Sequence, residues 1–401
     1  MSSFILFLQA FSIGILAPVL SLTLLSKGIS MTGLALIMGM YSLTAVSLEL
    51  PSGILADFFG RKKTFLMAQI ATACSIICIL SGTLLFVCAG MVLLGMGRAL
   101  SSGTLDAFYI DQMSKTIGME KTVSRVNLLD GVGLAAGAIV GGFLPVMSDR
   151  IFDGANIYNA GLILRLILTA FITVLTGLYI KEIREESEEI QLTLKTHLKE
   201  GMDLITGSRL LQLIFLSVFA TGFLLFSIET YWQPAFTLLP SSGEYLWLLG
   251  IISFLFFGAS SVGILIAEYL TKFFRISPKL FYIVARLLLS GAVVGLACSR
   301  IIPLFIVFLI TQYLFFGMSN LLEGILINKA IPSNKRSSIL SLSSLIMQSG
   351  GFAGSLLSSI LVAKASVWTI WVLGVIMVVG SAVVLVYKDS AQNKTGFDVD
   401  K

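Results

Sequence analysis

Acidic and basic residues within long apolar segments are the first feature of this sequence that could do chemistry. They are Glu49, Arg98, Asp106, Asp130, Arg165, Glu229, Arg286 and Glu323. A charge at the centre of a lipid bilayer costs about 2.5–3.5 kcal/mol even on the mildest scale. Each such residue is therefore expected to line a cavity or to have a charged partner, provided that the apolar segments cross a membrane.

The composition indicates that they do. Of the 401 residues, 56% are hydrophobic and only 12% are charged. The blocks without any charge include 1–26, 28–48, 64–97, 210–228, 301–322, 337–363 and 365–387. A helix needs about 20 apolar residues to cross the hydrocarbon core of a membrane, and only helices or closed barrels satisfy their backbone groups there. The sequence predicts an all-α polytopic membrane protein.

Blocks and breakers together predict twelve spans. They lie near 4–25, 32–56, 64–82, 84–110, 126–147, 158–180, 210–232, 246–268, 280–299, 303–327, 338–362 and 366–387. With a cytoplasmic N-terminus, the inner loops and the tail hold 20 of the 27 Lys and Arg residues. Such a bias sets the orientation, so both termini are predicted to be cytoplasmic.

The chain divides into two predicted six-helix bundles. Residues 1–180 form the first, residues 181–209 a cytoplasmic linker with an amphipathic helix, and residues 210–401 the second bundle and a short tail. The halves resemble each other: Gly95-Met96 matches Gly317-Met318, and "GLAAG" at 133–137 matches "GGFAG" at 350–354. A weaker match joins the segments that begin at Gly53 and Gly263. Two parallel repeats of six spans are typical of a large class of secondary transporters.

The turn after the second span carries the sequence "GILADFFGRKK". Asp57 comes near the end of a helix, and Gly60 permits a tight turn that returns Arg61 toward that end, where the two could pair. The residues Gly53, Leu55, Ala56, Asp57, Gly60, Arg61, Lys62 and Lys63 resemble the loop signature of the major facilitator superfamily, with Phe58 in place of the usual basic residue.

The resemblance implies a gating role for this loop. Asp57 and Arg61 would latch the two halves on the inner side, and Asp111 at the end of the fourth span would join them. The alternative is that Arg61, Lys62 and Lys63 serve orientation only.

The fourth span carries Arg98, Ser102 and Asp106. On one continuous helix, Asp106 would lie about 80° round from Arg98 and about 12 Å along the axis, with Ser102 between them. The segment "GRALSSG", which ends at Gly103, resembles the second superfamily motif, associated with proton-coupled members. The alternative is a purely structural buried ion pair.

The fifth span carries Gly133, Gly137, Gly141 and Gly142. This series resembles the third superfamily motif, found in the bacterial drug–proton antiporters, although Ala138 replaces the expected proline. Small residues four apart also permit ordinary close packing of helices, which is the alternative.

The remaining charged residues differ in what they suggest. Glu49 precedes Pro51 and could pair with Arg98 or Lys62 or take part in proton coupling.

Glu229 lies beside Tyr231 and Trp232. An acid with aromatic rings suits a lipophilic cation, although such rings could equally be interfacial anchors. Glu323 is its counterpart toward the inner side. Asp130 and Arg286 lie near inner helix ends and Arg165 near an outer end, and snorkelling explains the two arginines.

The sequence therefore favours a secondary transporter of the plasma membrane. The resemblance to multidrug efflux proteins implies alternating access and proton-coupled antiport of lipophilic or cationic compounds, with the proton on Asp106, Glu49 or Glu229. The alternatives are a nutrient or organic-anion uniporter or symporter, or a non-transporting receptor or scaffold. We expect a monomer in membrane lipid that binds a small molecule and protons. No enzyme activity, cofactor, metal site, nucleotide or nucleic acid is expected.

Overall fold

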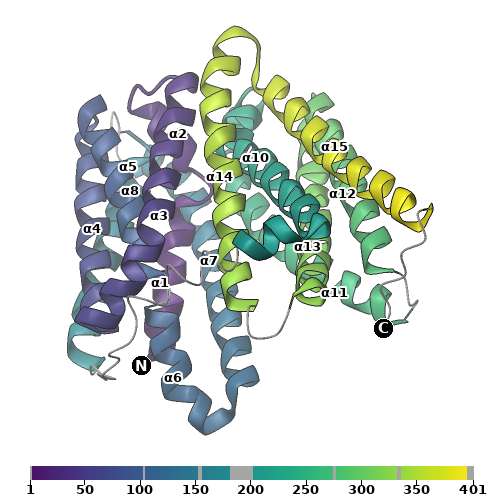
Figure 1. Cartoon of the computed structure of the whole chain (residues 1–401). Coiled ribbons are helices and arrows are strands. Elements are labelled where there is room, and N and C mark those ends of the chain that lie inside the picture. Colours follow the sequence, from purple (N-terminus) through teal and green to yellow (C-terminus); the bar gives the residue numbers. More distant parts are fainter. Residues whose placement is uncertain are drawn as a thin grey trace. The chain divides into compact units, whose positions relative to one another are not determined.

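The computed structural model describes residues 2–102, 104–151, 156–180, 202–273, 277–331 and 336–394 (Figure 1). Within these ranges the regular structure is helical and no strand occurs. The helices before the linker are α1 (Ser2–Leu16), α2 (Leu20–Ser26), α3 (Met31–Phe59), α4 (Arg61–Ser81), α5 (Leu84–Ser101), α6 (Leu105–Ile117), α7 (Met119–Ile151) and α8 (Asn159–Tyr179). After it come α10 (Arg209–Thr237), a 3₁₀ turn (Ser242–Tyr245), α11 (Leu248–Phe273), α12 (Pro278–Cys298), α13 (Ile302–Ala330), α14 (Arg336–Lys364) and α15 (Val367–Lys394). Most of the predicted linker helix, residues 181–201, lies outside the described residues.

The predicted all-α polytopic class is confirmed. Among the described residues, 11 helices are long and apolar enough to cross a membrane. The number becomes 12 if α1 and α2, which meet at an angle of 50°, form one broken span. The break falls around Pro18, which has no backbone N–H to donate. Here the Ala17 N–H donates to the Gly14 carbonyl and the Val19 N–H to the Leu16 carbonyl, so tight three-residue turns replace the regular α-helical hydrogen bonds.

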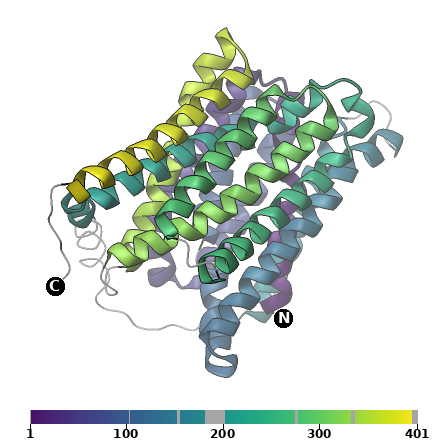
Figure 2. The ribbon, with the colours of Figure 1, turned by 90° about the vertical axis from the view of Figure 1, so that its right-hand side faces the viewer.

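The described chain forms two compact units, Met1–Gln191 with Thr230–Phe257 and Leu192–Glu229 with Gly258–Lys401. Helix α10 therefore contributes its first part to the second unit and its last part to the first. In the first unit α1 packs on α7, α4 on α5, and α3 on α5. Figures 1 and 2 both show α6 and the start of α7 as a hairpin that extends past the ends of the neighbouring helices of this unit.

Glycines bring α1 and α7 into backbone contact. A Cβ atom at Gly137 would overlap the carbonyl oxygen of Phe11, and one at Gly141 would overlap that of Ile15. Gly133 has the same relation to Phe7 and Ala10. Close approach of this kind needs small residues, so helix packing by itself accounts for the glycine series of α7.

The second unit repeats this packing. Gly350 on α14 lies against the Phe219 carbonyl of α10, as Gly133 lies against α1. Gly317 on α13 lies against Ser260 of α11, as Gly95 on α5 lies against Tyr41 of α3. The matched glycines thus occupy equivalent helix contacts in both units, which is the physical basis of the internal repeat. The weaker match has no such shared contact, because Gly53 has open space around it whereas Gly263 packs on Leu314.

The fourth predicted span is not one continuous helix. Helix α5 ends at Ser101, Ser102 is extended with φ −60° and ψ 128°, and α6 begins at Leu105. The Ser101 hydroxyl donates to the Arg98 carbonyl (3.0 Å) and the Thr104 hydroxyl to the Ser101 carbonyl (2.8 Å). Such local bonds compete with the helical ladder. The predicted helical stripe through Arg98, Ser102 and Asp106 is therefore wrong in its geometry, and Gly103 lies outside the described residues.

We predict that Gly137→Ala destabilises the protein by about 1–3 kcal/mol, because the new methyl group must push α1 and α7 apart. Gly131→Ala is the matched control on the same helix, since Gly131 has open space around its Cα. That control should be neutral or slightly stabilising, because alanine favours a helix. Thermal unfolding of the purified variants in detergent measures both; equal midpoints would contradict close packing at Gly137.

Candidate functional site

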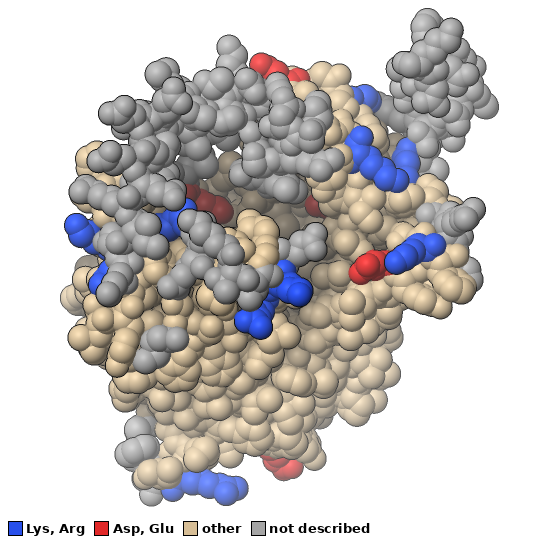
Figure 3. Space-filling view, turned by 90° about the horizontal axis from the view of Figure 1, so that it is seen from below, with Lys and Arg blue, Asp and Glu red and all other residues tan. Residues whose placement is uncertain are grey.

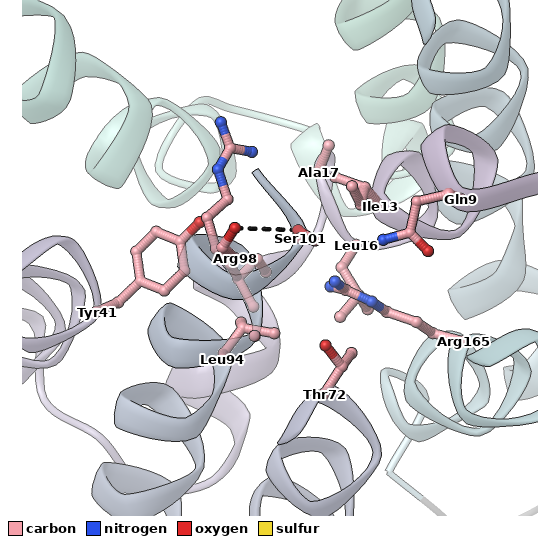
Figure 4. A pocket seen from close by; sticks show the side chains of 12 residues that line it. Gln9, Ile13, Leu16, Ala17, Tyr41, Thr72, Leu94, Arg98, Ser101 and Arg165 are labelled. Atoms are coloured by element: carbon pink, nitrogen blue, oxygen red, sulfur yellow. Dashed lines mark hydrogen bonds between the residues drawn. The ribbon is translucent and has the colours of Figure 1, made fainter. Parts of the chain in front are cut away.

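The first unit contains a polar pocket between α1, α3, α4, α5 and α8, which we call the arginine pocket (Figure 4). Its polar wall consists of Gln9, Tyr41, Thr72, Arg98, Ser101 and Arg165. Its apolar wall includes Ile13, Leu16, Leu20 and Leu94. Six helices meet at this pocket, because Leu20 adds the start of α2, so its chemistry is set by packing and not by any short stretch of sequence.

A second cavity of the same unit shares Gln9, Ile13, Arg98 and Ser101 with the arginine pocket. It adds Ser102, Asp106 and Asp130, and we call it the acid pocket. The structure thus brings together four predicted site residues, Arg98, Ser102, Asp106 and Asp130, although the predicted helix register was wrong. Arg98 is the charged group that faces both cavities.

The break after Ser101 places Asp106 in the first turn of α6, where a helix N-terminus favours a negative charge. Helix α6 packs on α7, which carries Asp130. Both carboxyl groups line the acid pocket. Like charges that share one small cavity disfavour each other's ionisation, so a pair of this kind can share a proton.

Arg165 on α8 was predicted to snorkel, and this was wrong. Its side chain is only 9% exposed and lines the arginine pocket. Among the described residues its Nε has no hydrogen-bond partner, and its guanidinium makes no ion pair. Figure 4 shows this guanidinium pointing inward, between Gln9, Leu16 and Thr72. The sequence signal that could have found it is a single arginine in an otherwise apolar span.

A hydrogen bond between two glutamines supports this wall. The Gln69 amide on α4 donates to the Gln9 carbonyl oxygen on α1 (3.0 Å). This bond leaves the Gln9 NH₂ group free to turn toward the arginine pocket, as Figure 4 shows. Gln69 is 1% exposed, so its position is held by packing on all sides.

The second unit handles its buried arginine differently. Arg286 on α12 is 1% exposed and donates to the Thr221 hydroxyl and to the carbonyl and hydroxyl of Ser217. The Arg286 guanidinium stacks on the Tyr282 ring, with 5.2 Å between its Cζ atom and the ring centroid. The Tyr282 hydroxyl donates to the Glu323 carboxylate (3.1 Å). The snorkelling prediction for Arg286 was therefore also wrong, and Glu323 belongs to this network.

Glu229 lies in the second unit, where it interacts with the Tyr313 hydroxyl of α13. Tyr231 and Trp232 are not interfacial anchors, because they are 0% and 2% exposed. The Tyr231 hydroxyl donates to the Met31 carbonyl (3.0 Å), and Trp232 contacts the Phe256 ring edge to face. Glu49 lies on α3 and is not among the residues that line the arginine pocket or the acid pocket.

A buried glutamine on α10, which sequence reasoning missed, satisfies the break between α1 and α2. The Gln233 amide donates to the Ala17 carbonyl (2.7 Å), and its oxygen accepts from the Ser21 N–H (3.0 Å). The Ser21 hydroxyl donates to the Thr230 carbonyl (2.8 Å). These bonds replace the helical partners that the break removes.

The turn between α3 and α4 has the predicted form. Gly60 has φ +93°, a conformation that favours glycine, and Arg61 begins α4 directly after it. Lys62 donates to the Gly177 carbonyl at the end of α8 (2.9 Å). The side chains of Asp57 and Asp111 lie outside what the structure describes, so the latch stays a prediction.

We predict that Arg286→Met lowers the free energy of unfolding by about 3 kcal/mol, because it removes three hydrogen bonds that the buried guanidinium donates to Thr221 and Ser217 and takes the cation out of the network that holds Glu323. Arg300→Met is the matched control: Arg300 is exposed and stacks on Trp368 at 5.5 Å, an interaction worth about 0.5–1 kcal/mol. Thermal unfolding in detergent compares the two. Similar midpoints would show that the buried network contributes little.

Comparisons with known proteins agree with this architecture. The sequence model of the Major Facilitator Superfamily matches residues 2–272. A comparison with curated protein sequences finds no match. Among solved structures, the nucleoside transporter NupG has a TM-score of 0.75 at 16% identity, covering 98% of each chain.

Two further structures share the fold. The xylose transporter XylE from E. coli, in an inward open conformation, has a TM-score of 0.68 at 13% identity, covering 96% of this chain and 95% of its own. A bacterial homologue of the human lysosomal transporter Spinster has a TM-score of 0.72 at 13% identity, covering 100% and 98%. At these identities the likeness shows the fold alone. The match of the family over more than half of the sequence is decisive: the chain belongs to the Major Facilitator Superfamily.

Proposed function

We propose that this protein is a proton-coupled secondary transporter that works by alternating access. The observation that carries the proposal is the position of Arg98, which faces the coupled carboxyl pair Asp106 and Asp130 on one side and the arginine pocket on the other. A group shared by a proton site and a solute pocket is what coupling requires.

Electrostatics supplies the coupling. While Asp106 and Asp130 are ionised, their charge offsets that of Arg98. When a proton neutralises the pair, Arg98 acts on the arginine pocket with its full positive charge. The affinity of that pocket for a charged solute then depends on the protonation of the acids, and by linkage the solute changes the affinity for the proton.

Drug–proton antiport is the second candidate. The interaction of Glu229 with Tyr313 favours it, because an acid beside an aromatic ring can receive a lipophilic cation. The glycines of α7 do not decide between the candidates, because close packing on α1 accounts for Gly133, Gly137 and Gly141, and Gly142 lies against Gly250 of α11.

We place the protein in the cell membrane as a monomer with both termini cytoplasmic. The excess of Lys and Arg in the predicted inner loops supports this orientation. Figure 3 shows several groups of Lys and Arg, and a smaller number of Asp and Glu residues, on the face seen from below. The proposed bundles remain 1–180 and 210–401, joined by 181–209, although residues 230–257 pack with the first unit.

We predict that Asp106→Asn and Asp130→Asn abolish pH-driven transport and retain solute binding, because an amide cannot carry the proton. Asp149→Asn is the matched control, since Asp149 is an exposed acid near the end of α7. The measurement is uptake of a probe into liposomes after a pH step, with internal pH followed by a trapped dye. Unchanged proton-driven uptake by either variant would remove that acid from the mechanism.

The same liposomes can show whether the solute moves with the protons or against them. Tetraphenylphosphonium tests cation antiport, and benzoate tests anion transport. A cation that moves against the proton flow, and stops with an ionophore, supports drug efflux. An anion that moves with the protons supports the other direction.

A further inference from the structure

The arginine pocket has an electrostatic imbalance that its own residues do not correct. Arg98 and Arg165 both line the pocket, and no carboxylate is among the described residues that line it. Two like charges that line one pocket raise its positive potential, and the neutral Tyr41 hydroxyl beside them does not cancel it. Gln9 adds a further donor, because its oxygen is already engaged by Gln69.

Arg165 and Arg286 give an internal comparison. Both are at least nine-tenths buried on helices of one chain. Arg286 is surrounded by oxygens of Ser217 and Thr221 and by the nearby charge of Glu323. The Arg165 guanidinium donates to no oxygen of the described residues; the difference lies in the terminal nitrogens, because Nε is unpartnered in both arginines. A buried charge without partners costs several kcal/mol, so a structural role does not explain Arg165.

The wall opposite the donors is apolar. Ile13, Leu16, Leu20 and Leu94 present aliphatic side chains to the same space. A ligand that complements both walls has a negatively charged head group and a small hydrocarbon body. An inorganic anion would leave the apolar wall unused, and a cation would be repelled by both arginines.

We propose that the arginine pocket binds a small amphipathic organic anion, a carboxylate or a phosphate monoester, with its head group on Arg165 and Gln9. Arg98 supplies additional positive charge and links the site to Asp106 and Asp130. The inference deepens the transport function proposed above and rests on it, because it names the class of solute. Anion binding needs no proton movement, so an experiment can refute anion binding without refuting proton-coupled transport, and the reverse.

The first test needs no ligand. Arg165→Met removes an uncompensated buried charge and should raise the unfolding midpoint of the ligand-free protein by a few degrees, whereas Arg286→Met should lower it. This opposite response distinguishes a binding arginine from a structural one. A loss of stability in Arg165→Met comparable to that in Arg286→Met would overturn the proposal.

The second test measures binding in phosphatidylcholine nanodiscs at constant ionic strength. Benzoate and phenyl phosphate are the anionic probes, and benzamide and benzylamine are their neutral and cationic counterparts. At least one anion should raise the unfolding midpoint saturably, and the counterparts should not. Arg165→Gln should weaken this binding about tenfold or more, since a charge-assisted hydrogen bond is lost. Arg150→Gln, an exposed arginine at the end of α7, should leave it unchanged.

Three results would overturn the inference. They are no response to either anion, an equal response to benzamide, or an anion response that survives Arg165→Gln. If phosphatidylglycerol in the nanodisc abolishes the anion response through Arg165, a lipid head group occupies the site, and the soluble solute is excluded. Anion binding that persists in Asp130→Asn without pH-driven transport would leave the binding site standing and refute the coupling alone.

Discussion

The cost of placing a guanidinium in a medium of low dielectric constant governs the organisation of this protein. Its two buried arginines respond to that cost in opposite ways. In the second unit, Arg286 donates hydrogen bonds to oxygens of Ser217 and Thr221, which offset part of that cost. In the first unit, Arg165 remains uncompensated within the described residues and therefore has binding energy left for a ligand.

Backbone contact between helices makes such a pocket possible. Because glycines let α1 approach α7 and α3 approach α5, side chains from six helices converge on one small volume. The repeated contacts at Gly95 and Gly317 show that both units use the same packing. The units differ in the side chains that these packed helices surround. The first unit contains the arginine pocket, and the second contains the hydrogen-bond network of Arg286.

The interruptions of the helices position the remaining chemistry. The break after Ser101 places Asp106 in the first turn of α6, in the cavity that Asp130 also lines. The backbone groups at the break around Pro18 bond to Gln233. At both points the chain gives up regular hydrogen bonds, and side chains replace them. Breaks of this kind are tolerated within a membrane where protein, not lipid, surrounds the backbone.

The sequence by itself determined the class of fold and the family, because these follow from long apolar blocks and from one loop motif around Gly60. It also identified Arg98, Asp106 and Asp130 as charged groups that need a polar environment. Only the tertiary structure decided which of them meet, because the rotation of each helix and the break at Ser102 set the direction of every side chain. The roles of Arg165, Arg286 and Gln69 could not be read from the sequence for the same reason: their partners lie on helices far away along the chain.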